Sequence, residues 1–153
     1  MIPQFKQQVA LNAVSVGTSG GTLVSSVIDT LGGRYATIDI WGTPQSATTQ
    51  AAAPSVLKLQ ESDTTVASTF VDVVGFRGGS ATATNVDFIV GIGSTSLPNQ
   101  YKMNVDCRYR KRYLSVAITA ISSQTFYGTA NLYRMEQSPS TATKAGVLSL
   151  VEG

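Results

Sequence analysis

The sequence predicts an all-β protein: a single antiparallel β-sandwich, jelly-roll-like, with about eight to ten strands. Three observations lead to this fold class. Apolar and polar residues alternate with a period of two, short apolar segments end at turn-forming residues, and hydroxyl side chains are abundant. The 153 residues include 17 Ser and 18 Thr. Such residues are poor in helix interiors, whereas β-branched Thr packs well on a pleated sheet.

Two segments alternate most clearly. In Tyr35–Trp41 the small and apolar residues fall on one face and the polar and aromatic residues on the other, and Gly42 ends the strand. Gln100–Tyr109 alternates over its whole length, with Tyr101, Met103, Val105, Cys107 and Tyr109 on one face. This pattern predicts that Cys107 lies on the buried face.

The remaining strands are predicted from shorter segments bounded by Gly, Pro, Asn, Asp or Ser. They are Thr22–Ile28, Val56–Gln60, Thr69–Val73, Val86–Ile92, Tyr113–Thr119, Thr125–Met135 and Val147–Val151.

We expect one domain. Residues 1–20 are predicted to be an N-terminal arm or a first strand, and residues 21–153 a single sandwich domain, because the chain is too short for two independent cores. Three tracts of small, nearly uncharged residues are predicted to be long loops that bind a partner or stay mobile until bound. These tracts are Thr43–Pro54, Gly78–Asn85 and Ser138–Gly146.

The chain contains no histidine and one cysteine. Without histidine, Ser-His-Asp and Cys-His relays and imidazole zinc sites are excluded, and a single cysteine forms no internal disulfide. We therefore expect no enzyme activity, no cofactor and no metal. No export signal or membrane-spanning run is apparent, which predicts synthesis in the cytoplasm and no membrane partner.

Two groups of residues could still support catalysis without histidine: a carboxylate pair and a cysteine thiolate. Glu61 and Asp63 are the only closely spaced carboxylates and would share a face of a strand, but the segment also fits a polar turn with Asp63 as the capping residue. Cys107 lies between Asp106 and Arg108 in sequence and would need a nearby cation and solvent to act as a thiolate. The preferred interpretation is a buried cysteine that packs as a small apolar residue.

The densest charge lies in Arg108–Tyr113, which contains Arg108, Arg110, Lys111 and Arg112. Alternation predicts that the three arginines share one face. Three interpretations stay open: a site for single-stranded nucleic acid, a protein interface, or a solvated hairpin. A net charge of +2 counts against nucleic acid, which needs several phosphate contacts together. The four basic residues are the candidate contacts for a protein partner.

Three sequence blocks carry a resemblance: Val56–Asp63, Phe70–Val73 and Arg112–Thr119. In this order they resemble small virion proteins of tailed bacteriophages, in particular capsid decoration (cement) proteins with a jelly-roll-like β-sandwich. The resemblance covers residues 35–132. It implies a non-enzymatic homo-oligomer, commonly a trimer, that stabilises the shell of major capsid protein from the capsid exterior. No functional residue of such a family carries over by position.

The low charged fraction, 13%, fits a subunit whose surface is covered by neighbours. The alternative is a ligand-binding module, either a carbohydrate-binding sandwich or a receptor-binding part of a head or tail fibre. Its expected signature is an aromatic platform. The large candidates for that platform are Trp41, Tyr101, Tyr127 and Tyr133.

Overall fold

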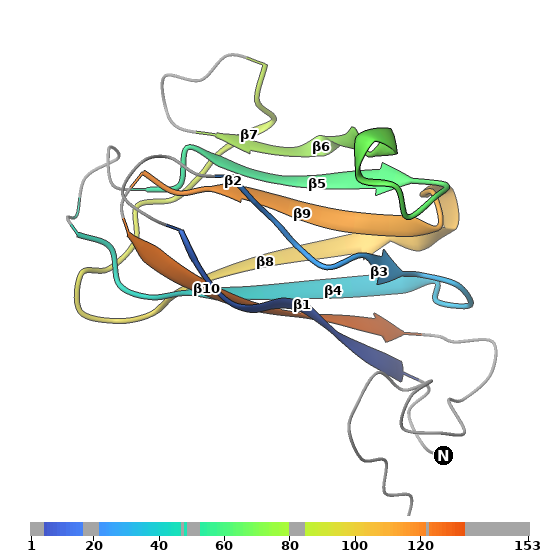
Figure 1. Cartoon of the computed structure of the whole chain (residues 1–153), viewed down its shortest axis with the longest axis horizontal. Helices are drawn as coiled ribbons and strands as arrows, with labels where there is room; N and C mark the ends of the chain where they lie inside the picture. The colour runs from blue at the N-terminus through green and yellow to red at the C-terminus, as the bar shows by residue number, and fades with distance from the viewer. Residues whose placement is uncertain are drawn as a thin grey trace, which may run out of the picture.

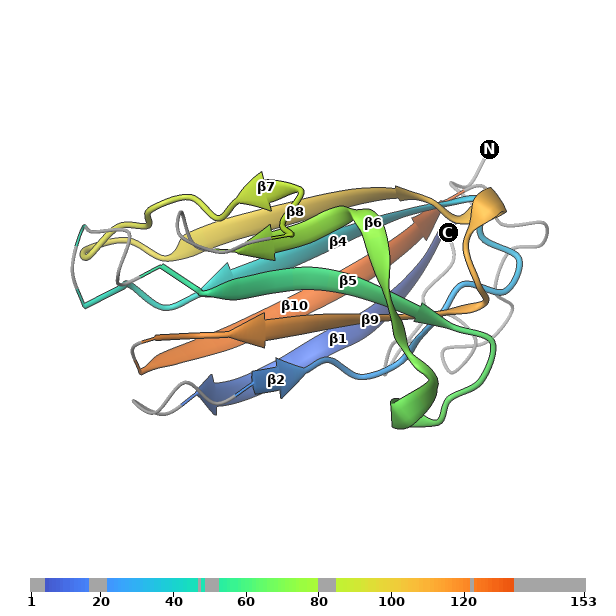
Figure 2. The same ribbon diagram turned by 90° about the horizontal axis from the view of Figure 1, so that it is seen from above.

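The computed structural model describes residues 5–16, 22–46, 48, 53–79, 85–121 and 123–133. In this part of the chain the strands form two sheets that pack face to face (Figure 1, Figure 2). Sheet A has four strands in the order β1 (Phe5–Val16), β10 (Gln124–Tyr133), β4 (Tyr35–Gly42) and β8 (Asn99–Asp106).

Sheet B has six strands, and β6 and β7 are its only parallel pair in the described part of the chain. Its order is β2 (Thr22–Val24), β9 (Tyr113–Thr119), β5 (Val56–Ser62), β6 (Val71–Gly79) and β7 (Phe88–Ile89), with β3 (Ile28–Asp29) also beside β9. Two single-turn 3₁₀ helices are η2 (Ala67–Thr69) and η3 (Cys107–Tyr109). No helix among the described residues is long and apolar enough to cross a membrane.

The strand pairs are nested in sequence. β1 pairs with β10, β2 and β3 pair with β9, β4 pairs with β8, and β5 pairs with β6. Successive pairs lie in alternate sheets, which is the double-sheet arrangement of a jelly roll. The predicted all-β sandwich of jelly-roll type is confirmed.

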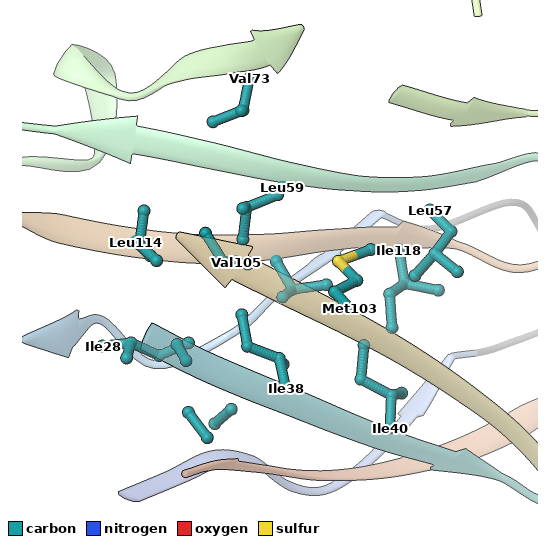
Figure 3. Packing of buried hydrophobic residues seen from close by; sticks show 14 of the residues in the cluster. Ile28, Ile38, Ile40, Leu57, Leu59, Val73, Met103, Val105, Leu114 and Ile118 are labelled. Atoms are coloured by element: carbon teal, nitrogen blue, oxygen red, sulfur yellow. The ribbon is translucent and has the colours of Figure 1, made fainter. Parts of the chain in front are cut away.

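The core lies between the inner faces of the two sheets. Figure 3 shows Ile38 and Ile40 of β4 and Met103 of β8 packed toward side chains of sheet B, such as Leu59 and Ile118. These residues are at most 4% exposed, as the period-two pattern of each strand requires. Burial of this apolar surface is the main stabilising contribution to such a fold.

Several strands lie where the sequence predicts them. Tyr35–Trp41 is β4, Val56–Gln60 is the first part of β5, and Tyr113–Thr119 is β9. Thr125–Met135 corresponds to β10 up to Tyr133. Met135, the tract Ser138–Gly146 and the predicted strand Val147–Val151 lie outside the described residues, as do parts of the other two small-residue tracts.

The single strand predicted over Thr22–Ile28 is wrong. Two short strands, β2 and β3, stand in its place, with residues 25–27 between them. The reason is Ser25, whose hydroxyl accepts a hydrogen bond from Val116 N at 2.8 Å. A side-chain oxygen therefore satisfies an amide of β9 that a regular ladder would pair with a carbonyl.

The predicted bounds of Thr69–Val73 and Val86–Ile92 also need correction. Thr69 belongs to η2, where its hydroxyl donates to Val66 O at 2.7 Å, and β6 then runs on to Gly79. Gly75 makes this longer strand possible because it adopts φ +92°, which L side chains rarely adopt. β7 is limited to Phe88–Ile89, two residues that pair with the end of β6.

The strand predicted over Gln100–Tyr109 ends early, at Asp106. The Asp106 carboxylate accepts a hydrogen bond from Arg108 N at 3.1 Å and so caps η3. Tyr109 is 77% exposed rather than buried, and the three arginines of the segment do not share one strand face. Cys107 nevertheless lies in the core, as predicted.

Residues 1–20 were predicted to be an N-terminal arm or a first strand, and the structure describes residues 5–16 of this segment. Phe5–Val16 is β1, paired with β10 along its length, so the alternative of a first strand holds for these residues. The division at residue 20 does not separate an arm from the sandwich, because β1 is an edge strand of sheet A.

Candidate functional site

The outer face of sheet A gathers aromatic side chains. Because Ile38 and Ile40 point into the core, the alternate residues of β4 point outward, and Trp41 is among them. Tyr127 of β10 lies directly opposite Trp41 in the strand register. Opposed residues have Cβ atoms about 4.5–5.5 Å apart, so their rings are neighbours. We call Trp41 and Tyr127 the aromatic platform.

The platform is accessible. Trp41 is 36% exposed and Tyr127 is 48% exposed. Within the described part of the chain, neither ring contacts a cation. These two residues were predicted from the sequence as members of a ligand platform, and the fold brings them together.

A second aromatic pair lies at the other end of the same face. Tyr133, a third predicted platform residue, is opposite Tyr35 and is 42% exposed. One ring of this pair makes a cation–π contact within the protein, because the guanidinium of Arg108 lies 5.1 Å from the centre of the Tyr35 ring. The two pairs are six residues apart along β10, or about 20 Å.

Polar side chains from three strands lie between the two aromatic pairs. We call these residues the polar strip. In register order they are Asn131, Thr37 and Asn104, then Thr129, Asp39 and Lys102.

Asp39 is unusual within the polar strip. It lies on the outward side of β4, next to Trp41 by alternation, yet it is only 8% exposed. Its Oδ1 atom is covered and makes no hydrogen bond among the described residues. Lys102 Nζ lies 3.3 Å from Oδ1 as an ion pair, but the Lys102 side chain is 53% exposed. Buried polar atoms without hydrogen bonds are rare in native proteins.

Tyr101, the fourth predicted platform residue, is not on this face. It points to the inner side of β8 and packs against the core at one end of the sandwich. It lines a hollow of about 360 Å³ formed mainly by residues 91–94 and 98–101. Burial raises the pKa of the Tyr101 hydroxyl, and the nearby Gln45 side chain offsets part of that shift without reaching hydrogen-bonding geometry. Tyr101 therefore belongs to a different location from the platform.

The basic cluster predicted to contact a partner lies in the turn before β9. Each of its four side chains has an acidic partner within the chain. The N–O distances are 2.6 Å for Arg108–Asp106, 3.7 Å for Arg110–Glu61, 3.4 Å for Lys111–Asp63 and 2.9 Å for Arg112–Asp29. Hydrogen bonds from Arg112 and from Arg108 lower the pKa values of Asp29 and Asp106 respectively. The cluster is thus locally neutralised, and its contact with a partner stays a prediction.

Glu61 and Asp63, the possible carboxylate pair, are part of this arrangement. Glu61 Oε2 also accepts a hydrogen bond from Lys111 N at 3.2 Å. The turn after β5 is capped by Ser62, whose hydroxyl accepts from Thr64 N at 3.1 Å, and not by Asp63 as predicted. Glu61 of β5 thus holds the basic turn against sheet B, whereas Asp63 forms only an exposed ion pair with Lys111.

Cys107 is a free, buried cysteine, 8% exposed. Burial, together with the neighbouring Asp106 carboxylate, raises the pKa of the Cys107 thiol to about 11. A protonated, covered thiol is a poor nucleophile, in keeping with the preferred interpretation of the sequence.

Every Asp and Glu side chain in the described part of the chain lies in an ion pair. Within the same residues, no group of three or more His, Cys, Asp or Glu side chains is arranged to hold a metal ion. The surface that is described therefore offers few unbalanced charges to a partner.

Sequence reasoning missed Asp39, Lys102 and Tyr35 as members of this face. The alternation in Tyr35–Trp41 already puts Tyr35, Asp39 and Trp41 on one side of the strand. Lys102 required the pairing of β4 with β8, which a single sequence does not give.

No protein-family model matches the sequence, and no curated protein matches it. Among solved structures, the fold is similar to the K2 cleaved adhesin domain of Lys-gingipain, with 16% identity, coverage of 79% of this chain and 71% of that chain, and a TM-score of 0.41. The K1 cleaved adhesin domain of Lys-gingipain from Porphyromonas gingivalis W83 gives 16% identity, 84% and 69% coverage, and a TM-score of 0.36. At these values the likeness carries no argument about function.

Proposed function

We propose that this chain is a non-enzymatic carbohydrate-binding β-sandwich module of the kind that forms receptor-binding parts of phage head or tail fibres. The aromatic platform supports the proposal. Trp41 and Tyr127 offer adjacent ring faces on which the apolar face of a sugar stacks, while the polar strip exchanges hydrogen bonds with its hydroxyl groups. An open, nearly neutral sheet face suits an extended, uncharged ligand.

A single shallow site of this kind binds weakly, since few contacts offset the loss of translational and rotational freedom. Several copies on one particle would raise the apparent affinity by avidity. The homo-oligomer expected from the sequence, a trimer, is part of this proposal for that reason.

A glycan array tests the function. The wild-type protein is expected to bind a subset of glycans, and Trp41→Ala and Tyr127→Ala are each expected to weaken binding by about tenfold or more, as for a central aromatic contact. Tyr113→Ala is the matched control, because Tyr113 points outward on sheet B and stacks on Arg112, 4.9 Å from its ring centre. Unchanged binding in folded Trp41→Ala protein would contradict the proposal.

A second proposal follows from the sequence resemblance: a capsid decoration protein that packs on the major capsid protein from the outside of the virion. The observation that favours it is the combination of internal charge pairing with exposed apolar residues along the edge of sheet B. Val74 is 72% exposed, Val71 51% and Ile89 49%. Exposed apolar surface of this kind is typical of protein contacts.

The two proposals differ in what binding requires. A decoration protein is expected to bind capsids stripped of it at a fixed stoichiometry, and this binding should weaken in Val74→Asp but not in Trp41→Ala. Co-sedimentation with capsids of the encoding virus measures it, and analytical ultracentrifugation gives the oligomer number. A monomeric mass together with no capsid binding would contradict the decoration role.

A further inference from the structure

Asp39 places a covered carboxylate oxygen beside the aromatic platform, and this oxygen has an ion-pair partner but no hydrogen bond among the described residues. On an outward strand position a carboxylate normally faces water, but Asp39 is 8% exposed and its Oδ1 atom makes no hydrogen bond among the described residues. A covered carboxylate oxygen without a hydrogen bond is costly. A ligand donor that reaches it replaces the lost water and gains a charge-assisted hydrogen bond.

The neighbours of Asp39 leave it available as an acceptor. Thr37, its neighbour on one side, uses its hydroxyl to donate to Asn104 Oδ1 at 3.1 Å. Lys102 approaches Oδ1 to 3.3 Å without hydrogen-bonding geometry, and its side chain is 53% exposed. Because the Lys102 side chain is half-exposed on a flexible stem, its ammonium can turn toward solvent when a ligand donor takes its place beside Oδ1.

We infer that the face formed by Trp41, Tyr127 and Asp39 selects neutral sugars, whose hydroxyl groups donate to the Asp39 carboxylate, and rejects acidic sugars. The inference rests on the proposed carbohydrate-binding function and names the ligand class for the same site. Beside the platform the local charge is one carboxylate and one ammonium. A second carboxylate in the ligand would meet Asp39 in a covered position, where like charges repel strongly.

The chain provides its own probe, because Trp41 is the only tryptophan. Fluorescence titration of the full chain with neutral gluco-, galacto- and manno-oligosaccharides, and with sialylated counterparts, reports binding at the platform directly. Neutral sugars are expected to change the Trp41 emission, and sialylated ones are expected to bind more weakly.

Asp39→Asn tests the acceptor. We expect it to weaken binding of the neutral sugar by roughly tenfold or more, because a charged acceptor is lost. Asp72→Asn is the control on the outer face of sheet B, where Asp72 already binds Lys58 and Gln60.

Monodeoxy sugars test the same contact in the wild-type protein, in case Asp39→Asn fails to fold. One deoxy position is expected to lose roughly tenfold or more in affinity, as the missing hydroxyl leaves Asp39 without a donor. Equal affinity in folded Asp39→Asn, no effect of any deoxy position, or tighter binding of sialylated sugars would overturn the inference while leaving carbohydrate binding in place. If no sugar changes the Trp41 emission, both the inference and the proposed function fail.

Discussion

The outer faces of the two sheets differ in how far their own side chains satisfy one another. On sheet B, Lys58 and Gln60 of β5 both donate to the Asp72 carboxylate, at 2.9 and 2.8 Å. Ser115 and Ala117 of β9 are 1% and 2% exposed. On sheet A the corresponding positions carry exposed aromatic rings and a covered carboxylate oxygen without a hydrogen bond.

Both faces come from the same alternation of inward and outward residues, so the pattern that builds the fold does not determine what each face does. Small and complementary side chains cover the centre of the outer face of sheet B, which therefore contributes to stability. Large aromatic side chains on sheet A add accessible surface that the fold does not require. We therefore expect substitutions on the outer face of sheet B to change stability and substitutions on the outer face of sheet A to change binding.

The largest expected effect separates the inner and outer sides of β10. Phe126 is fully buried and Tyr127, the next residue, is 48% exposed. Phe126→Ala is expected to lower the free energy of unfolding by about 3–5 kcal/mol. Tyr127→Ala should cost less than half of that, because its ring lies on the accessible face. Urea unfolding followed by circular dichroism measures both, and equal losses would mean that the platform is part of the structural framework.

The edge of sheet B is expected to be sensitive at Gly75. Its φ of +92° is unfavourable for any residue with a Cβ, although no atom lies within 4 Å of the position that a Cβ would take. Gly75→Ala is expected to cost about 1–3 kcal/mol through backbone strain alone. Gly91→Ala is the control, since Gly91 also has open space but no positive φ. Equal thermal midpoints for the two variants would show that β6 tolerates a different backbone path.

Asp87 holds the same edge through its carboxylate. It accepts hydrogen bonds from Gly75 N, Arg77 N and the Arg77 guanidinium, and the Arg77 hydrogen bond is the main reason that the pKa of Asp87 lies well below its usual range. The ionised Asp87 carboxylate therefore contributes its full stabilisation above its pKa in the unfolded chain, near 4. This stabilisation is lost as the pH falls below that value.

Thermal unfolding between neutral pH and about pH 3 tests this. The wild type is expected to lose more stability on acidification than Asp87→Asn does. Asp63→Asn serves as control, because that carboxylate makes one 3.4 Å ion pair and is 73% exposed. If Asp87→Asn and Asp63→Asn show the same acid dependence, Asp87 has no special role at the edge.

The smallest expected effect concerns the ion pair between Lys58 and Asp72. The pair measures 2.8 Å, and the two side chains are 28% and 37% exposed. Lys58→Met is expected to lower stability by about 0–1 kcal/mol, and less at high salt, because exposed ion pairs are screened. A loss that exceeds that of Gly75→Ala would mean that the outer face of sheet B depends on charge more than on packing.

The sequence was sufficient for the fold class because alternation at a period of two survives in β4, β5 and β9. The predicted strand bounds were wrong where a side-chain oxygen, rather than a backbone carbonyl, accepts the hydrogen bond of a backbone amide. The Ser25 hydroxyl divides the first predicted strand of sheet B, and the Asp106 carboxylate ends β8 three residues early. Both are local hydrogen bonds by residues that also occur in regular strands, so composition and spacing do not reveal them.

For the candidate site, the aromatic residues were predictable but their grouping was not. Trp41, Tyr127 and Tyr133 share a face because β10 pairs with β4, and Tyr101 is excluded because its position on β8 has the opposite orientation. The ion-pair partner of each basic residue could not be predicted from the sequence either. Arg112 meets Asp29, 83 residues away, which depends on the pairing of β3 with β9.

The nesting of strand pairs also determines the order in which this chain can fold. Phe5 pairs with Tyr133. β1 therefore has no neighbouring strand in sheet A until β10 has been synthesised and has left the ribosome. The innermost pair, β5 with β6, needs only a short loop to close, whereas the outermost pair closes nearly the whole chain. Folding is therefore expected to be slow, because the outermost pair joins residues far apart in sequence. Loss of β10 would leave both β1 and β4 with unpaired edges open to association with other chains.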